Sequence, residues 1–235
     1  MKKQFTCVDL FSGAGGLSRG FYDAGYNVVL GVDFDDAALQ TFKANHGNAE
    51  AMKLDLFDHN NINVIVDFLK EKNIELDVLV GGPPCQGFSI AGPRDMNDKR
   101  NTLYLAMVKL AATLKPQAVV LENVPGMLQT NGGIGAKRII EDFAEIGYKM
   151  TPKLLYAPDY GIPQIRKRVF FVGLRDSENA FEFPEPFVDS KDYVTCEDAI
   201  SDLPSLQTSD GEIVYRSYYW RSAMSGLFCC WKGER

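Results

Sequence analysis

The chain has 235 residues, 46% of them hydrophobic and 24% charged, which is an ordinary composition for a globular domain. No stretch of the sequence is long and apolar enough to cross a membrane. The net charge of -6 argues against binding of nucleic acid over the whole surface, although it is compatible with a local basic channel. Five scattered cysteines and two histidines show no zinc-ligand spacing, so we expect no metal site and a reducing, cytoplasmic location.

Segments typical of strands and helices alternate along most of the chain. Strands are expected at residues 5–11, 27–33, 50–54, 76–82 and 117–123, and helices at 16–25, 37–47, 62–72, 102–116 and 136–146. This alternation predicts a parallel sheet with helices on both faces. Two further strands, 148–157 and 168–174, have no helix between them and predict an antiparallel pair at the edge. The expected fold class is therefore α/β, with a Rossmann-like sheet that is mostly parallel and has an antiparallel edge strand.

A glycine-rich turn, DLFSGAGGLSRGF, joins the first strand to the first helix. Gly13, Gly15 and Gly16 let the backbone approach a ligand closely, and the start of the helix offers free N–H groups. The pattern is not the dinucleotide fingerprint, because Ser18 stands where the third glycine belongs. It suits a smaller, less phosphorylated ligand; the alternative is a tight turn that binds nothing.

Acidic residues end the second and third strands. Asp33 can accept hydrogen bonds from two ribose hydroxyls, Phe34 can stack on a purine, and Asp55 can accept from an adenine amino group. Taken singly, each aspartate is as well explained as a helix cap. Because strand ends of a parallel sheet meet at one crevice, the set together favours a nucleoside ligand.

The stretch GGPPCQGFS places a cysteine just beyond the fourth strand. Pro83 and Pro84 stiffen the backbone and hold Cys85 at the carboxyl edge of the sheet, where such folds bind ligands. Glu122 ends the fifth strand, which is expected to lie beside the fourth. A thiol next to a carboxylic acid is a usable catalytic pair. The alternative for Glu122 is a structural role in bracing the loop that follows it.

The stretch QIRKR enters the last expected strand. Alternation places Gln164, Arg166 and Arg168 on one face, where two arginines can bind a phosphate or the polar edge of a base. A solvated edge strand with charged side chains is the alternative.

Together, the motifs DLFSGAGG, GVDFD, GGPPCQGFS, DKRNTLY, ENVPG and QIRKR resemble the DNA (cytosine-5)-methyltransferase family of bacterial modification enzymes, over about residues 5–206. The resemblance implies a class I S-adenosylmethionine-dependent methyltransferase fold. It also implies transfer of a methyl group to carbon 5 of a cytosine flipped out of double-stranded DNA, within a restriction-modification system. The alternatives are a tRNA cytosine-5 methyltransferase, an inactive cofactor-binding fragment that needs a partner chain and, least favoured, a nicotinamide-dependent oxidoreductase.

The resemblance also implies roles for individual residues. Cys85 would be the nucleophile that forms a covalent adduct, Glu122 would engage cytosine N3, and Arg168, together with Arg166, would lie near the O2 atom of the base. The cofactor would be lined by Phe11, Gly13, Gly15, Gly16, Leu17, Asp33, Phe34, Asp55, Leu56, Pro84 and Leu103.

Two regions are expected along the chain. Residues 1–197 would form the catalytic domain, and 198–235 would be a linker with the truncated start of a target-recognition region. The family's recognition domain and its final motif have no counterpart in the sequence. We therefore expect a truncated or frameshifted product, or one subunit of a split enzyme whose partner chain supplies the remainder.

Overall fold

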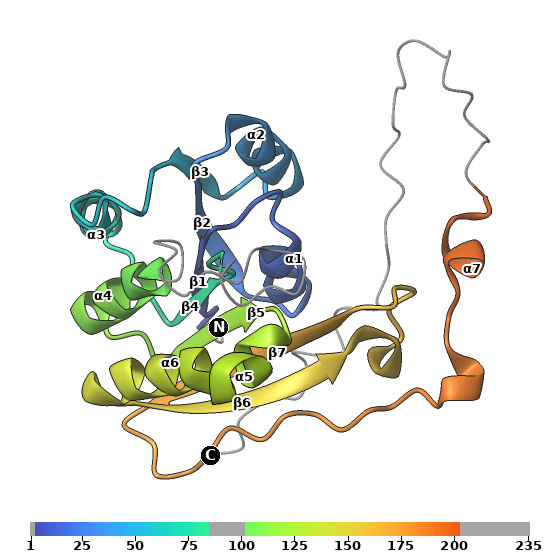
Figure 1. Ribbon diagram of the computed structural model, residues 1–235. Helices are drawn as coiled ribbons and strands as arrows, with labels where there is room; N and C mark the ends of the chain where they lie inside the picture. Colours follow the sequence, from blue (N-terminus) through green and yellow to red (C-terminus); the bar gives the residue numbers. More distant parts are fainter. Residues whose placement is uncertain (1–2, 85–101, 203–235) are drawn as a thin grey trace.

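A computed structural model describes residues 3–84 and 102–202 of the chain (Figure 1). In this part, one sheet has the strand order β3-β2-β1-β4-β5-β7-β6. The strands are β1 (Thr6–Leu10), β2 (Asn27–Asp33), β3 (Glu50–Lys53), β4 (Val78–Gly81), β5 (Ala118–Asn123), β6 (Tyr148–Tyr156) and β7 (Lys167–Arg175). The longer helices are α1 (Gly16–Asp23), α2 (Asp36–Asn45), α3 (Asn61–Glu71), α4 (Tyr104–Leu114) and α6 (Ile134–Glu145).

The strands and long helices expected from the sequence all form, and the predicted mixed α/β sheet is confirmed. β1 to β5 pair in parallel, while β7 runs antiparallel to both β5 and β6. The antiparallel strand is thus second from the edge, and β6 forms the edge itself. After β5 the chain runs through α6 to β6 at the edge of the sheet. It then turns back, and β7 lies between β6 and β5.

Several short elements were not predicted from the sequence. They are α5 (Gly126–Gln129), α7 (Cys196–Ile200) and the 3-10 turns η3 (Thr130–Gly133), η4 (Ala157–Tyr160) and η5 (Ser190–Asp192). The start of α7 has a capping box in which the Thr195 hydroxyl accepts from the Asp198 N–H and the Asp198 carboxylate accepts from the Thr195 N–H. The spacing T-x-x-D could have revealed this helix.

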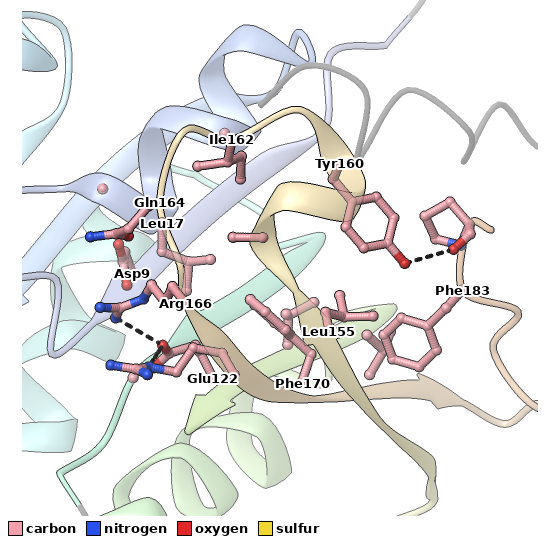
Figure 2. A pocket seen from close by; sticks show the side chains of 18 of the residues that line it. Asp9, Leu17, Glu122, Leu155, Tyr160, Ile162, Gln164, Arg166, Phe170 and Phe183 are labelled. Atoms are coloured by element: carbon pink, nitrogen blue, oxygen red, sulfur yellow. Dashed lines mark hydrogen bonds and ion pairs between the residues drawn. The ribbon is translucent and has the colours of Figure 1, made fainter. Parts of the chain in front are cut away.

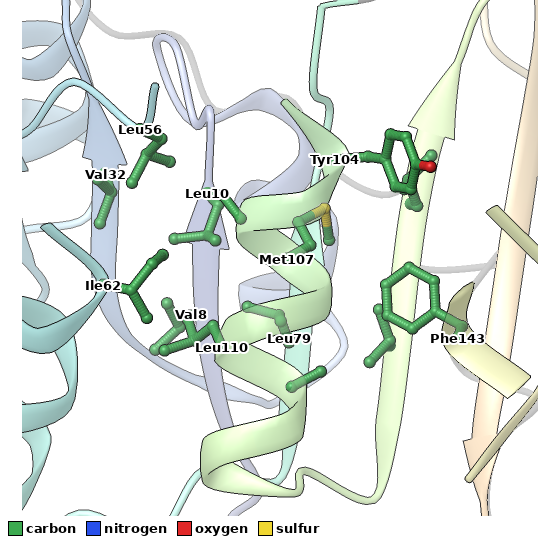
Figure 3. Packing of buried hydrophobic residues seen from close by; sticks show 14 of the residues in the cluster. Val8, Leu10, Val32, Leu56, Ile62, Leu79, Tyr104, Met107, Leu110 and Phe143 are labelled. Carbon is green, nitrogen blue, oxygen red and sulfur yellow. The ribbon is translucent and has the colours of Figure 1, made fainter. Parts of the chain in front are cut away.

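Alternating residues of each strand pack into two hydrophobic clusters, one on each face of the sheet. Val8, Leu10 and Leu79 pack against α3, α4 and α6 on the first face (Figure 3). On the opposite face, α1 and α2 contribute Phe21 and Phe42. Phe181 and Phe183 also pack against the sheet on this second face. They belong to the extended segment that follows β7.

In the ranges that the structure describes, no helix combines the length and apolar character needed to cross a membrane. Of the proposed second region, only residues 198–202 are described, so the expected division at 197/198 stays a prediction.

Candidate active site

The glycine-rich turn has an unusual backbone that the glycines make possible. Phe11, Gly13 and Gly15 all have positive φ angles, of 59°, 52° and 87°. A Cβ added to Gly15 would lie 2.5 Å from Cε1 of His46, so this position has room only for glycine. Around Gly13 and Gly16, by contrast, an added Cβ would meet nothing within 4 Å. The turn therefore packs tightly behind Gly15 and is open at Gly13 and Gly16, where a ligand could approach the backbone.

Asp33 ties this turn to the end of β2. Its carboxylate accepts hydrogen bonds from the Gly13 N–H at 2.8 Å, the Phe34 N–H at 2.8 Å and the Asp35 N–H at 3.0 Å. The cap of α2 is Asp35, whose side chain accepts from Ala37 and Ala38. The alternative reading of Asp33 as this helix's cap is therefore wrong. Asp33 orders the turn and still presents carboxylate lone pairs at the strand end.

The other residues expected at the cofactor lie in different environments. Phe34 is 68% exposed, which leaves a ring face available for stacking. Asp55 is exposed, and its carboxylate accepts from the Phe57 N–H at 2.9 Å. The Leu56 side chain packs in the apolar cluster of the first face, so only its backbone could face a ligand (Figure 3).

The loop between β4 and α4 is described only at its ends. Pro84 is exposed, and Leu103 is buried just before α4. Cys85, the expected nucleophile, lies outside the described residues.

Glu122 and the two arginines of QIRKR form one cluster. Nε of Arg168 lies 2.8 Å from Oε1 of Glu122, and Nη2 of Arg166 lies 3.4 Å from the same oxygen. Antiparallel pairing of Glu122 with Phe170 brings the start of β7 to the end of β5. A Cβ on Gly82 would be 3.4 Å from Oε2 of Glu122, so this second oxygen points toward the loop that follows β4. The predicted shared face of Arg166 and Arg168 therefore serves to hold Glu122.

Asp9, which lines the cavity described below, was not among the site residues expected from the sequence. It is 1% exposed, and its Oδ2 accepts a hydrogen bond from the Ser18 hydroxyl. Its Oδ1 has no hydrogen-bond partner in the part of the chain that the structure describes. Burial raises the pKa of this carboxyl to about 7, although the Ser18 hydrogen bond lowers it. The signal was present in the sequence, because a carboxylate inside the apolar run of a buried strand is costly without a partner.

A cavity of about 400 Å³ lies between the start of α1, Asp9 and the Glu122 cluster. Figure 2 shows Asp9, Leu17, Gln164, Arg166 and Glu122 gathered at one end. The other end is apolar and aromatic, with Leu155 of β6, Tyr160 of η4, Phe170 of β7 and Phe183 of the extended segment. Val172 and Phe181 also line the cavity.

The cavity brings together only some of the predicted site residues. Phe11, Gly16 and Leu17 of the expected cofactor set line it with Glu122, Arg166 and Arg168 of the expected catalytic set. The remaining described members of the cofactor set lie outside its lining: Gly13, Gly15, Asp33, Phe34, Asp55, Leu56, Pro84 and Leu103. Within residues 3–84 and 102–202, no group of three or more His, Cys, Asp or Glu side chains could hold a metal ion.

Taken together, the strand order, the reversed β7 and the glycine-rich turn after β1 define a class I S-adenosylmethionine-dependent methyltransferase fold. The chain belongs to the C-5 cytosine-specific DNA methylase family, whose family model matches residues 5–224. The family and the fold expected from the motifs are thus confirmed.

Individual relatives are identical to this chain at about a third of the aligned positions. It is 36% identical over 237 residues to the type II methyltransferase M.DdeI of Desulfomicrobium norvegicum, across 94% of this chain and 55% of that protein. It is 34% identical to M.AquIA of Picosynechococcus sp., across 84% of this chain and 88% of that protein. A crystal structure of an E. coli prophage protein, described as a DNA modification methyltransferase, has a TM-score of 0.73 and 34% identity, covering 86% of this chain and 56% of that one. The chain thus spans little more than half the length of M.DdeI and of the prophage protein.

Proposed function

We propose that the chain is the catalytic region of an enzyme that transfers a methyl group from S-adenosylmethionine to carbon 5 of cytosine in DNA, within a restriction-modification system. The observation that carries this proposal is the Glu122–Arg166–Arg168 cluster, which opens into the same cavity as the glycine-rich turn. A carboxylate held by two arginines, close to a glycine-rich turn that can bind a nucleoside, is suited to hydrogen bonding with a polar nucleobase.

The residues present fit S-adenosylmethionine as the methyl donor. The open backbone at Gly13 and Gly16 would accept the amino-acid end of the molecule, and Asp33 would bind its ribose hydroxyls. The exposed Phe34 ring would stack on the adenine, with Asp55 at the adenine edge. When bound, the cofactor supplies an electrophilic methyl group.

The proposed roles of the protein side chains follow from the chemistry of cytosine, whose carbon 5 is a weak nucleophile. The thiolate of Cys85 adds to carbon 6 and makes carbon 5 electron-rich. Glu122 promotes protonation at N3, which takes up the charge that this addition creates. Arg168 and Arg166 hold Oε1 of Glu122, so that Oε2 is presented in a fixed direction. Loss of the proton from carbon 5 after methylation then expels the thiolate and frees Cys85.

DNA binding in this proposal needs more positive surface than the described residues provide at the cavity. The target base must leave the duplex, which costs a few kcal/mol, and lysine and arginine contacts to phosphates normally supply the offsetting affinity. Arg166 and Arg168 are engaged with Glu122, and Nζ of Lys167 lies over the Tyr156 ring at 5.3 Å. Arg94, Lys99 and Arg100 are further candidates outside the described residues. We therefore propose that a target-recognition region, on a second chain or on further sequence, completes the enzyme, which acts in the cytoplasm.

A methyl-transfer assay with tritiated cofactor tests the proposal on DNA and on tRNA, with and without a complementary fragment that carries a recognition region. We expect label in DNA cytosine only, and much more of it with the fragment. Cys85→Ser and Glu122→Gln should abolish transfer. Cys196→Ser is the matched control, because this exposed cysteine donates a hydrogen bond to the Pro163 carbonyl and serine can do the same.

Covalent chemistry has its own readout. DNA with 5-fluorocytosine should trap the wild-type protein as a denaturation-resistant adduct. Carbon 5 then carries fluorine in place of the proton whose loss would expel the thiolate. Label in tRNA instead of DNA would replace the proposed substrate, and transfer by the Cys85→Ser variant at the wild-type rate would remove Cys85 as the nucleophile.

A further inference from the structure

Asn123, the residue after Glu122, makes a buried contact that the proposed reaction has not used. Its side chain is at the end of β5, and the residue is 4% exposed. The side-chain N–H of Asn123 donates to the Pro83 carbonyl at 3.0 Å, and its Oδ1 accepts from the Val124 N–H at 2.8 Å. A single amide therefore links the end of β5 to the loop that leaves β4.

The proline pair explains why a side chain makes this link. The parallel pairing of β4 and β5 ends with Gly81 opposite Leu121. Pro83 and Pro84 have no backbone N–H, so the ladder cannot continue through donors of their own. The carbonyl of the buried Pro83 still requires a partner, and the Asn123 amide provides it. The side chain thus takes the place of the next rung of the ladder.

This link is next to the catalytic cluster on one side and to the nucleophile's loop on the other. Asn123 follows Glu122 directly, and alternation along β5 points the two side chains in opposite directions. Cys85 is two positions beyond Pro83 in the sequence. The same strand ends also approach each other at Gly82, where an added Cβ would lie 3.4 Å from Oε2 of Glu122.

We propose that Asn123 is a positioning residue for methyl transfer: its amide anchors the start of the Cys85 loop to the strand end that carries Glu122. It touches neither the base nor the cofactor. Its role is to fix the separation between the groups that act on carbon 6 and on N3 of the same cytosine. This inference rests on the proposed function, because a fixed separation matters only if Cys85 and Glu122 act on one base.

The contact uses both ends of the amide. Nδ2 of Asn123 donates to the Pro83 carbonyl while Oδ1 accepts from the Val124 N–H, and a carboxylate of the same size can only accept. Asn123→Asp has nearly the same shape and keeps the acceptor for Val124. It loses the donor, and its carboxylate oxygen would face the Pro83 carbonyl oxygen, which pushes the loop away.

Gln117, just before the other end of β5, offers a matched control. The Gln117 side chain precedes β5 and donates to Oδ1 of Asp77 at 3.0 Å. Both amides therefore bridge to a partner near β4, forty positions earlier in the chain. Gln117, however, lies at the amino ends of the parallel strands β4 and β5, and Asn123 lies at their carboxyl ends with Glu122. Gln117→Glu replaces a donor with a carboxylate, as Asn123→Asp does.

The experiment compares the two variants with wild type in the assembly that methylates DNA, using steady-state kinetics, calorimetric binding of S-adenosylmethionine and the rate of adduct formation with 5-fluorocytosine DNA. Asn123→Asp should lower kcat and the adduct rate by about 10- to 100-fold, the size of effect that a misplacement of about 1 Å produces. Cofactor affinity and the KM for DNA should change by less than about threefold. Gln117→Glu should lower the unfolding midpoint yet leave kcat per folded molecule unchanged. Asn123→Ala, which removes the donor without adding charge, should lower kcat in the same way.

Asn123 would have only a structural role if its variants and Gln117→Glu lowered kcat per folded molecule by the same factor. The same conclusion would follow if neither substitution changed kcat. An Asn123→Asp variant that binds cofactor poorly would equally overturn the proposal. If the wild-type assembly forms no adduct with 5-fluorocytosine DNA, the proposed function itself fails, and the role of Asn123 falls with it.

Discussion

The buried carboxyl of Asp9 leads to a prediction about the pH dependence of stability. Burial raises its pKa from 3.8 to about 7. The folded state therefore keeps a proton on Asp9 over a pH range in which the unfolded chain has lost it. Because the folded state binds the additional proton, stability falls as the pH rises from about 4 to about 7 and then levels off. About three pKa units at about 1.4 kcal/mol each give a loss of about 4 kcal/mol across this range.

Asp9→Asn removes the titrating group and keeps the shape. The amide oxygen can still accept the hydrogen bond from Ser18, so the packing of β1 against α1 should survive. We expect the variant to lack this component of the pH dependence and to be more stable than wild type at pH 8, by up to about 4 kcal/mol. At pH 4 the two proteins should be nearly equal in stability, since both are neutral at this position.

Urea unfolding followed by circular dichroism, between pH 4 and pH 8.5, measures the difference between the two proteins. Ser18→Ala is a second probe, because the hydroxyl lowers the pKa of Asp9 and its removal should move the loss of stability to higher pH. Parallel pH profiles for wild type and Asp9→Asn would refute the reasoning, since they would show that Asp9 titrates alike in the folded and unfolded chain.

Three further predictions concern stability and cofactor binding. Gly15→Ala should destabilise the protein by about 3 kcal/mol in urea unfolding, from its left-handed φ and the clash behind it, while Gly16→Ala, which meets open space, should not; equal effects would contradict the packing argument. Asp33→Ala should weaken binding of S-adenosylmethionine by roughly 1–3 kcal/mol in calorimetry, and an unchanged affinity would leave it only its structural role in the turn. Asp77→Asn should act on stability with the opposite sign to Asp9→Asn. Burial alone would raise the pKa of Asp77, but the hydrogen bonds from Lys3 and Thr6 outweigh it, so this carboxylate stabilises the fold above its ordinary pKa and the benefit is lost in acid; a variant as stable as wild type at pH 7 would exclude this.

Local patterns in the sequence determined most of the fold. The alternation of apolar runs and glycine or proline stops predicted each long element, because strand and helix periodicity are properties of neighbouring residues. The same patterns placed Asp33, Asp55 and Glu122 at strand ends. The motifs also carried the family resemblance, which the comparison with known proteins confirmed.

The tertiary structure decided which of these groups meet. Only the insertion of β7 beside β5 brings Arg166 and Arg168 onto Glu122, more than forty positions earlier in the chain. The assignment of Asp35 rather than Asp33 as the cap of α2 depended on the exact path of the backbone at the end of β2.

The roles of Asp9 and Asn123 likewise came from contacts across the sheet. The orphaned oxygen of Asp9 and the link from Asn123 to Pro83 exist because β1, β4 and β5 lie side by side. Strand order is set by the packing of both sheet faces and by the closure of long connections, which involve residues far apart in the chain. For that physical reason, local sequence patterns place each side chain at a strand end but do not say which other side chain it will face.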